Sequence, residues 1–379
     1  MAGKKILLVA GEVSADQHGA KLVQALKTLQ PDLNVWGIGG NELAASGMEL
    51  VFHLEKMAFL GITEVIRHLP FIQKVMKTLL ERARQDPPDC AVLIDYPGFN
   101  LRLAAQLKKM GIPVVYYISP QIWAWGRRRV HKIAKYVDKM LVLFPFEKEF
   151  YAQYGIEAEY VGHPLVDKHY PHLPEGFKSV ETDATVLGLL PGSRRNEIKN
   201  LLPKMVETAS RLLNEGVLKS VLILKASHLS DDFYTPFLQH ADDRFQLTDE
   251  PMYAFLPKLD AALVASGTAT LETAYYAVPM VIVYHVHELT YWLGRLFVKI
   301  DHIGLANIVA EKEIAPELIQ QDFTPAKAAS LLKPMFEPKN NRAIRQQMLV
   351  VRKKLGEPGA SLRAARAISK FLQEVSAAG

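Results

Sequence analysis

The sequence predicts an α/β protein with two doubly wound domains that face a cleft, followed by carboxy-terminal helices. Three observations support this. Short apolar runs typical of buried parallel strands recur along the chain and alternate with helical segments. The stretch 165–184 is rich in Pro, His, Lys, Glu and Asp and lacks apolar periodicity, which is typical of a linker. The length of 379 residues favours two domains, each with its own core.

We therefore expect a first domain over 1–164, a linker over 165–184, a second domain over 185–339 and basic helices over 340–379. These last helices either cross back to the first domain or pair with another chain. In the first domain, a polar loop over 11–19 is expected to precede a helix from about 20, and another helix is expected from about 101. The expected strands are 4–10, 91–95, 114–118, 139–144, 158–161, 185–190, 221–225, 261–264 and 279–284.

The composition is that of an ordinary globular enzyme, with 49% hydrophobic and 22% charged residues. Cys90 is the single cysteine, which excludes an internal disulfide framework and fits a reducing cytoplasm. We expect neither a signal peptide nor a membrane span, because no window reaches the roughly 18 apolar residues needed. The net charge of +5 is compatible with nucleic acid, an anionic membrane surface or a phosphate-rich substrate.

Asp95 ends the apolar run 91–95, and Pro97 and Gly98 then favour a turn. In open α/β sheets, ligands bind outside the carboxyl ends of the strands, so Asp95 is placed where catalysis is common. The alternative is that Asp95 caps the next helix. The residues alone leave both interpretations open.

The segment 57–80 combines many apolar side chains with basic ones such as Arg67, Lys74 and Lys77. It is too short and too charged to span a bilayer. A helix of this kind either lies on a membrane surface and receives acyl chains, or is an ordinary core helix.

Two loops of the second domain are typical of anion sites. Gly192, Ser193 and Arg194 stand between a strand and a helix start, and Ser266, Gly267 and Thr268 open a second helix. Free backbone N–H groups and the helix dipole favour phosphate at such positions. Glu272 follows within reach of ribose hydroxyls. Ser and Thr are also routine N-caps, but two such loops in one domain favour a nucleotide-diphosphate site.

No D-x-D spacing occurs, so a two-carboxylate metal clamp is not indicated, and Arg194 with the helix N-termini would meet the diphosphate charge. His285 and His287 suggest either a metal or, without a third ligand, a packed pair. Trp123 and Trp125 suggest a substrate wall. The basic run 127–132 is either a solvated helix face or an anion site. A nucleic-acid-binding protein is disfavoured, because no recognition helix or aromatic RNA motif is present.

Several long strings together resemble one family nearly end to end, the lipid-A-disaccharide synthases, which are inverting glycosyltransferases with the GT-B fold of two Rossmann-like domains. The strings lie at 11–16, 57–65, 95–100, 119–125, 161–164, 190–194, 266–272, 307–308 and 316–320. Two departures occur: Ala15 stands where the family usually has Gly, and Ala306 where Pro usually precedes Asn307. Both put local loop geometry in question.

The resemblance implies transfer of 2,3-diacylglucosamine from its UDP conjugate to the 6-hydroxyl of 2,3-diacylglucosamine 1-phosphate (lipid X), without metal or cofactor. It implies a general base at Asp95, a further catalytic residue at Glu12, UDP contacts at Arg194 and Asn307, a ribose contact at Glu272, and a donor-site position at Gln320. With an acylated substrate, the predicted acyl or membrane contacts are Met57, Phe59, Leu60, Ile66, Leu69 and Ile72. The implied location is the cytoplasm, peripherally on the inner face of the inner membrane. The alternative is another GT-B enzyme, an epimerase or a transferase with a soluble acceptor.

Overall fold

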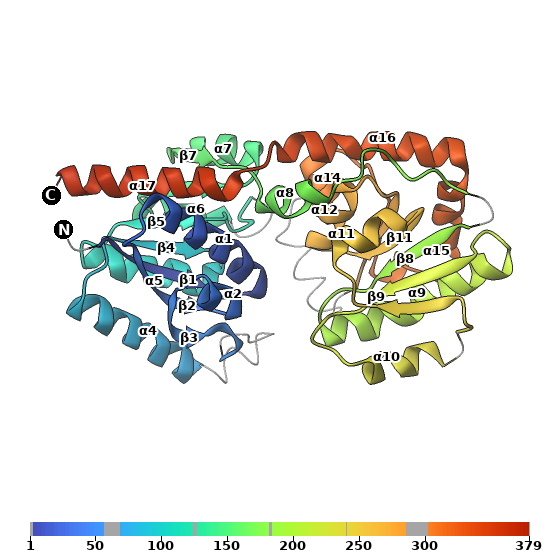
Figure 1. Cartoon of the computed structure of the whole chain (residues 1–379), viewed down its shortest axis with the longest axis horizontal. Helices are drawn as coiled ribbons and strands as arrows, with labels where there is room; N and C mark the ends of the chain where they lie inside the picture. Colours follow the sequence, from blue (N-terminus) through green and yellow to red (C-terminus); the bar gives the residue numbers. More distant parts are fainter. Residues whose placement is uncertain are drawn as a thin grey trace. The chain divides into compact units, whose positions relative to one another are not determined.

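A computed structural model describes residues 3–56, 69–123, 127–181, 184–239, 241–285 and 302–378. The chain forms two compact units (Figure 1): unit 1 comprises Met1–Lys168 and Glu357–Gly379, and unit 2 comprises His169–Gly356. Both are α/β units built on a parallel sheet, which confirms the predicted fold class. Within the described residues, no helix has the length and apolar character needed to cross a membrane.

Unit 1 contains a seven-stranded sheet of order β3-β2-β1-β4-β5-β6-β7. Every strand pair is parallel. The strands are apolar because both faces of the sheet are covered by helices, as the predicted runs required. Their bounds are β1 (Lys5–Ala10), β2 (Asn34–Gly39), β3 (Glu49–His53), β4 (Cys90–Ile94), β5 (Val114–Tyr117), β6 (Lys139–Val142) and β7 (Ala158–Tyr160).

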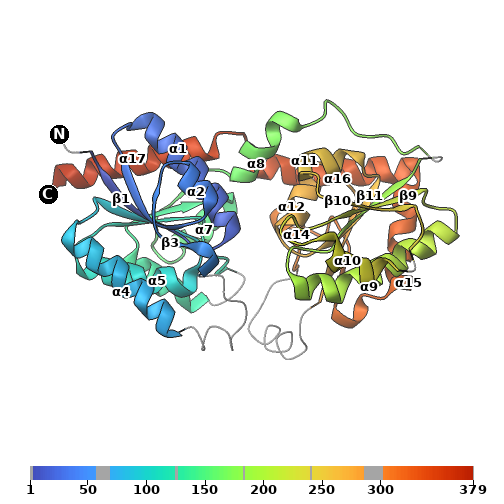
Figure 2. The same cartoon turned by 60° about the horizontal axis from the view of Figure 1, so that its bottom comes forward.

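The helices of unit 1 lie on the two faces of this sheet (Figure 2). One face carries α4 (Leu69–Gln85) and α5 (Pro97–Lys109), whereas α1 (Val13–Leu29) and the chain's last helix, α17 (Ala360–Ala378), pack together on the other. The Asp167 carboxylate fixes the start of α17, since it accepts hydrogen bonds from the backbone N–H groups of Gly359, Ala360 and Ser361 at 2.6–3.0 Å. The shorter helices are α2 (Asn41–Ala45), α6 (Val130–Tyr136), α7 (Pro145–Ala152) and α8 (Pro164–His169).

Unit 2 repeats the architecture with a six-stranded parallel sheet of order β10-β9-β8-β11-β12-β13. Its strands are β8 (Val186–Leu190), β9 (Ser220–Leu224), β10 (Phe245–Thr248), β11 (Ala261–Ala265), β12 (Met280–Tyr284) and β13 (Glu317–Ile319). Its helices are α9 (Arg195–Asn214), α10 (Asp231–Leu238), α11 (Met252–Phe255), α12 (Thr268–Tyr275), α14 (Leu305–Ala310), α15 (Pro325–Leu332) and α16 (Pro338–Leu355).

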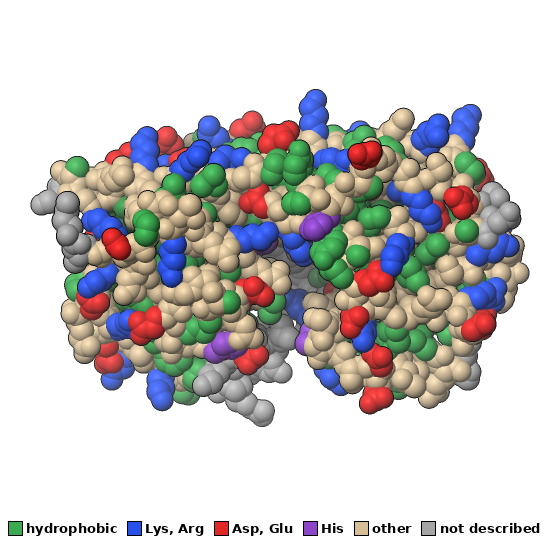
Figure 3. Space-filling model, viewed as in Figure 1, with side chains coloured by type: hydrophobic (Ala, Val, Ile, Leu, Met, Phe, Trp, Pro, Cys, Tyr) green, Lys and Arg blue, Asp and Glu red, His purple; other side chains and the backbone are tan. Residues whose placement is uncertain are grey.

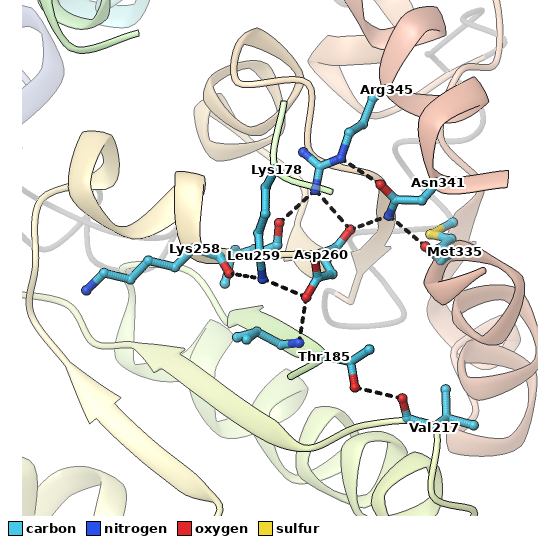
Figure 4. A network of polar contacts seen from close by, with 10 residues as sticks. Lys178, Thr185, Val217, Lys258, Leu259, Asp260, Met335, Asn341 and Arg345 are labelled. Atoms are coloured by element: carbon cyan, nitrogen blue, oxygen red, sulfur yellow. Dashed lines mark hydrogen bonds and ion pairs between the residues drawn. The ribbon is translucent and has the colours of Figure 1, made fainter. Parts of the chain in front are cut away.

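A buried polar network ties α16 to the sheet of unit 2 (Figure 4). Asp260, fully buried just before β11, accepts hydrogen bonds from the Lys178 ammonium and the Val186 N–H. On α16, Arg345 donates to the backbone oxygen of Leu259 and to the Asn341 side chain. Burial lowers the pKa of Arg345 to about 10, against the opposing charge of Asp260. The two carboxy-terminal helices therefore belong to different units, α16 to unit 2 and α17 to unit 1.

Two local expectations were wrong. The predicted loop 11–19 is mostly helix, because α1 begins at Val13 as soon as Gly11 ends the strand. The helix expected from about 101 begins at Pro97, whose fixed φ suits the first helical turn. The first part of the predicted linker is helix α8, in which the apolar residues Leu165 and Val166 are buried.

Candidate active site

Asp95 lies immediately after β4, at the carboxyl edge of the unit 1 sheet. Asp95 and Tyr96 have φ angles of 43° and 47°, in the left-handed region that non-glycine residues seldom adopt. Side chains of unit 1 stabilise this turn. The Asn100 amide donates to the backbone oxygens of Ile94 (3.1 Å) and Asp95 (2.8 Å), and the Tyr116 hydroxyl donates to the backbone oxygen of Asp95. Strain sustained in this way is characteristic of functional sites.

The Asp95 carboxyl is electrostatically perturbed. Burial and, to a smaller extent, the nearby Glu12 charge raise its pKa to about 7, against a hydrogen bond from the Tyr96 N–H that lowers it. A carboxyl with this pKa is half ionised near neutral pH, which suits proton transfer. The N-cap position of α5 is occupied by Tyr96 and not by Asp95, so Asp95 does not stand where the capping interpretation requires it.

Glu12 lies in the same unit, exposed at the N-cap of α1, and its side chain makes no capping hydrogen bond. Gly11 brings this loop against the strained turn: a Cβ at Gly11 would lie 2.5 Å from the Tyr96 ring. The structure therefore brings the two predicted catalytic carboxylates of unit 1 into electrostatic contact.

The loop after β8 supplies the first predicted anion site of unit 2. Gly192 has φ 100°, and Ser193 and Arg194 are exposed before α9. The N–H groups of Ser193 and Arg194 donate to the Glu197 carboxylate, which folds back from the first turn of α9. Burial raises the pKa of Glu197, while the Arg194 charge opposes the shift. A bound phosphate would compete with Glu197 for these two donors.

The loop after β11 contains the second predicted anion site of unit 2. Gly267 and Thr268 open α12, and a Cβ built on Gly267 would meet no atom of the described residues within 4 Å. Ser266 has a different role, because its hydroxyl donates to the backbone oxygen of Ile303 at 3.2 Å. One turn into α12, Glu272 retains 13% side-chain exposure and its Oε1 lies 2.7 Å from His169 Nε2.

Asn307 is fully buried on α14, and its carboxamide is engaged within the protein. It donates to the Ala315 oxygen and to Glu317, and accepts from the N–H groups of Ile314 and Ala315, all at 2.7–3.0 Å. Glu317 also accepts from the N–H groups of Ile303 and Gly304. In this geometry Asn307 shapes the segment leading to β13, where buried Gln320 follows with a left-handed φ of 55°.

Most of the predicted acyl-contact segment lies outside the described residues, including Met57, Phe59, Leu60 and Ile66. Its described part is the first turns of α4. There Leu69 is 40% exposed, while Ile72 is partly buried against the core of unit 1. The apolar character of α4 is thus partly explained by packing, with Val75, Leu79 and Ala83 fully buried.

The predicted tryptophan wall, the basic run and the histidine pair were the other candidate features of the sequence. Trp123 is core rather than a substrate wall: it is only 9% exposed, its Nε1 donates to buried Glu147 at 3.3 Å, and its ring packs on Phe146. The basic run after it spans a 3-10 helix (Arg127–Arg129) and the start of α6, and its described side chains Arg128, Arg129, His131 and Lys132 are exposed, which favours the solvated alternative. Trp125 and His287 lie outside the described residues. Among the described residues, no three His, Cys, Asp or Glu side chains form a group suited to a metal ion.

Basic and acidic side chains are interspersed over the face of the molecule seen in Figure 3. Many exposed cations are paired with neighbouring carboxylates, as Arg82 with Glu49 and Lys258 with Glu250. The positive net charge is therefore not gathered into one stripe on that face, unlike the electrostatic footprint of a nucleic-acid-binding protein.

Several solved structures have a similar fold. They include an S. aureus MnaA–UDP complex (TM-score 0.66, 13% identity, covering 98% of this chain and 97% of that one). They also include Acinetobacter baumannii MurG (TM-score 0.63, 16% identity, 97% and 99% covered). At these identities the likeness defines the class, a GT-B-type fold of two Rossmann-like units.

Sequence comparison identifies the family. The profile of the lipid-A-disaccharide synthetase family matches residues 6–371. The lipid-A-disaccharide synthase of Myxococcus xanthus is 42% identical over 376 residues, covering 97% of both chains, and that of Syntrophus aciditrophicus is 41% identical over 378 residues, covering 96% of this chain and 97% of its own. The chain belongs to the lipid-A-disaccharide synthase family of glycosyltransferases.

Proposed function

We propose that this chain transfers 2,3-diacylglucosamine from its UDP conjugate to the 6-hydroxyl of 2,3-diacylglucosamine 1-phosphate, forming a β-1,6-linked disaccharide 1-phosphate and UDP. The family supplies the reaction. The observation that carries the proposal within the molecule is Asp95, a carboxyl with a pKa of about 7 on a strained turn at a sheet edge.

In this proposal Asp95 accepts the proton of the acceptor 6-hydroxyl as the hydroxyl oxygen attacks the anomeric carbon. The bond between that carbon and the diphosphate oxygen breaks, the configuration inverts, and UDP leaves with the electron pair. A general base must reach the hydroxyl directly or through one water. Glu12 keeps the proton affinity of Asp95 high through its charge.

Unit 2 takes the nucleotide. Arg194 is the exposed cation next to Gly192 and Ser193 and meets the leaving diphosphate. The N-terminus of α12 at Gly267 and Thr268 adds backbone donors, and Glu272 accepts from ribose hydroxyls. Ser266, Asn307 and Gln320 shape the surrounding loops, on the evidence of their internal hydrogen bonds and burial.

The acyl chains give the segment from Met57 to Ile72 its function. In this proposal Met57, Phe59, Leu60, Ile66 and exposed Leu69 contact acyl chains or the membrane, and nearby lysines and arginines favour an anionic surface. The protein would then work as a peripheral protein on the inner face of the inner membrane. Flotation with vesicles of anionic and zwitterionic lipid tests this, with Leu69→Ser expected to reduce binding.

The deciding experiment incubates the purified protein with UDP-2,3-diacylglucosamine, with and without the monosaccharide acceptor. We expect UDP release and the disaccharide mass only when the diacylated acceptor 1-phosphate is present. An epimerase would instead alter the UDP-sugar without any acceptor, and a transferase with a soluble acceptor would release UDP only when an unacylated sugar is added. Either result would reject the proposal.

A further inference from the structure

His169 is the first residue of unit 2, and no motif in the sequence singles it out. Its side chain is fully buried, and its Nε2–H donates to Glu272 Oε1 across 2.7 Å. Of this pair, only Glu272 keeps exposed surface, 13% of its side chain. The carboxylate is therefore the member that a ligand can reach, and the imidazole is the member that holds it in place.

The imidazole is itself held by α12 and the residue after it. His169 Nδ1 lies 3.3 Å from the Tyr276 hydroxyl, and the two rings meet edge to face with centroids 5.4 Å apart. Since Glu272 and Tyr276 are four residues apart, His169 spans one turn of the helix. A buried side chain with partners at both ring nitrogens has one orientation, and it imposes one orientation on Glu272.

The chain passes between the units a second time after Gly356, and the helix that precedes this crossing, α16, also contacts the end of α12. Arg352, four residues before the end of unit 2, donates two hydrogen bonds to the Tyr275 backbone oxygen at 3.0 and 2.7 Å. On the unit 1 side, Asp167 binds the start of α17, as described above. Within unit 2, both chain crossings are therefore anchored to the end of the helix that carries Glu272.

We infer that His169 is a positioning residue for the nucleotide: it fixes Glu272 for the ribose diol and thereby couples occupation of the nucleotide site to the ordering of the crossing segment 164–172. This inference rests on the proposed ribose contact of Glu272. A diol that donates to a carboxylate binds more tightly when the carboxylate is already fixed, because less side-chain freedom is lost on binding. By linkage, bound nucleotide must stabilise the His169–Glu272 contact in return.

His169→Phe keeps a buried ring and removes the donor, whereas His169→Gln keeps a donor. We expect His169→Phe to raise the Kd of UDP and the KM of the UDP-sugar about tenfold, the usual effect of losing a hydrogen bond to a charged group, with kcat within twofold. His169→Gln should restore most of the affinity. His172→Ala is the matched control, because His172 is exposed in the same segment and stacks on Tyr253 instead.

Hydrogen exchange gives a readout beyond affinity. With saturating UDP, exchange over 164–172 should slow in the native protein and in His172→Ala, but not in His169→Phe, where only α12 should remain protected. Native affinity together with native protection in His169→Phe would overturn the inference. If His169→Phe fails to fold, Tyr276→Phe removes the partner of His169 Nδ1 and so releases the imidazole that holds Glu272. Loss of protection over 164–172 then supports the inference, and native protection overturns it.

Glu272→Gln separates the inference from its premise. If Glu272→Gln weakens UDP binding and His169→Phe does not, the ribose contact stands and the positioning role falls. If neither variant weakens binding, the ribose contact falls and the inference falls with it. Parallel weakening by Glu272→Gln and His169→Phe, with recovery in His169→Gln, supports both.

Discussion

At the end of β4 in unit 1, Asp95 and Tyr96 both adopt left-handed backbone angles, whereas the loop after β8 in unit 2 obtains its positive φ from Gly192. A left-handed conformation costs a non-glycine residue roughly 1 kcal/mol or more, and glycine almost nothing. Unit 1 offsets this cost with hydrogen bonds from Asn100 and Tyr116. The strain identifies a place where a particular side chain, and not only a turn, is required.

The two edges also differ in their exposure to water. The Asp95 carboxyl is withdrawn enough for its pKa to reach about 7, while Ser193, Arg194 and Thr268 are exposed. Proton transfer near neutral pH needs a carboxyl with raised proton affinity, and capture of a diphosphate needs donors that a ligand can reach. One fold, repeated in the chain, thus provides two opposite environments at equivalent edges.

Asp95→Asn should have the largest effect, because it affects catalysis at the unit 1 sheet edge and not UDP binding at the unit 2 sheet edge. It removes the base but leaves unit 2 intact, so we expect kcat to fall about 10²–10⁴-fold while UDP affinity stays within twofold. Steady-state turnover and calorimetric UDP titration measure the two quantities. Glu149→Gln, at an exposed glutamate of unit 1, is the control and should retain full activity. Turnover of Asp95→Asn within tenfold of the native rate would remove Asp95 from the role of base.

Arg194→Ala should show the converse pattern. We expect the KM of the UDP-sugar and the Kd of UDP to rise about 10–100-fold, since a charge-assisted contact to phosphate is lost. Arg195→Ala is a close control, because the Arg195 guanidinium stacks 4.4 Å above the Phe233 ring. If the two variants weakened UDP equally, general positive charge, and not one placed guanidinium, would account for binding.

The pH dependence of activity should show which of the two sheet edges holds the titrating group. The base acts as a carboxylate, and burial raises its pKa to about 7, so kcat/KM should fall about tenfold per pH unit below 7 and level off above it. Glu12→Gln removes the second cause of the raised pKa and should move this acid limb to lower pH. Arg194→Ala should leave its position unchanged. An acid limb that moved with Arg194 but not with Glu12 would place the titrating group in unit 2.

The sequence was sufficient for most of the strands, because strands covered on both faces appear as continuous apolar runs. The edge strands β3, β10 and β13 were not predicted, since they are only partly buried and lack such a run. The sequence was also sufficient to place Asp95 at a strand end. It failed where local signals compete: α1 starts directly after Gly11, and Pro97 begins a helix instead of ending a strand. It could not reveal that Glu197 folds back onto Ser193 and Arg194, that Asn307 is internally bonded, or that His169 reaches Glu272 across 103 residues. Such contacts depend on tertiary packing, although Glu197 at the third helical position is a recognisable capping signal.

The smallest expected effect concerns stability and follows from the same carboxyl. With a folded pKa of about 7 and an ordinary unfolded value, Asp95 holds a proton in the folded state between about pH 4 and 7 that the unfolded chain has released. Stability contributed by that proton is present at low pH and is lost as pH rises toward 7. Asp95→Asn cannot ionise, so its Tm should equal that of the native protein near pH 4, where both folded and unfolded chains keep the proton, and exceed it by about 2–5 °C at pH 8, equivalent to about 1–2 kcal/mol. Thermal unfolding at both pH values, with Glu149→Gln as the reference, measures the difference. A Tm difference that did not grow with pH would mean that the folded protein imposes no cost on the ionised carboxylate, and the contrast between the two sheet edges would then rest on geometry alone.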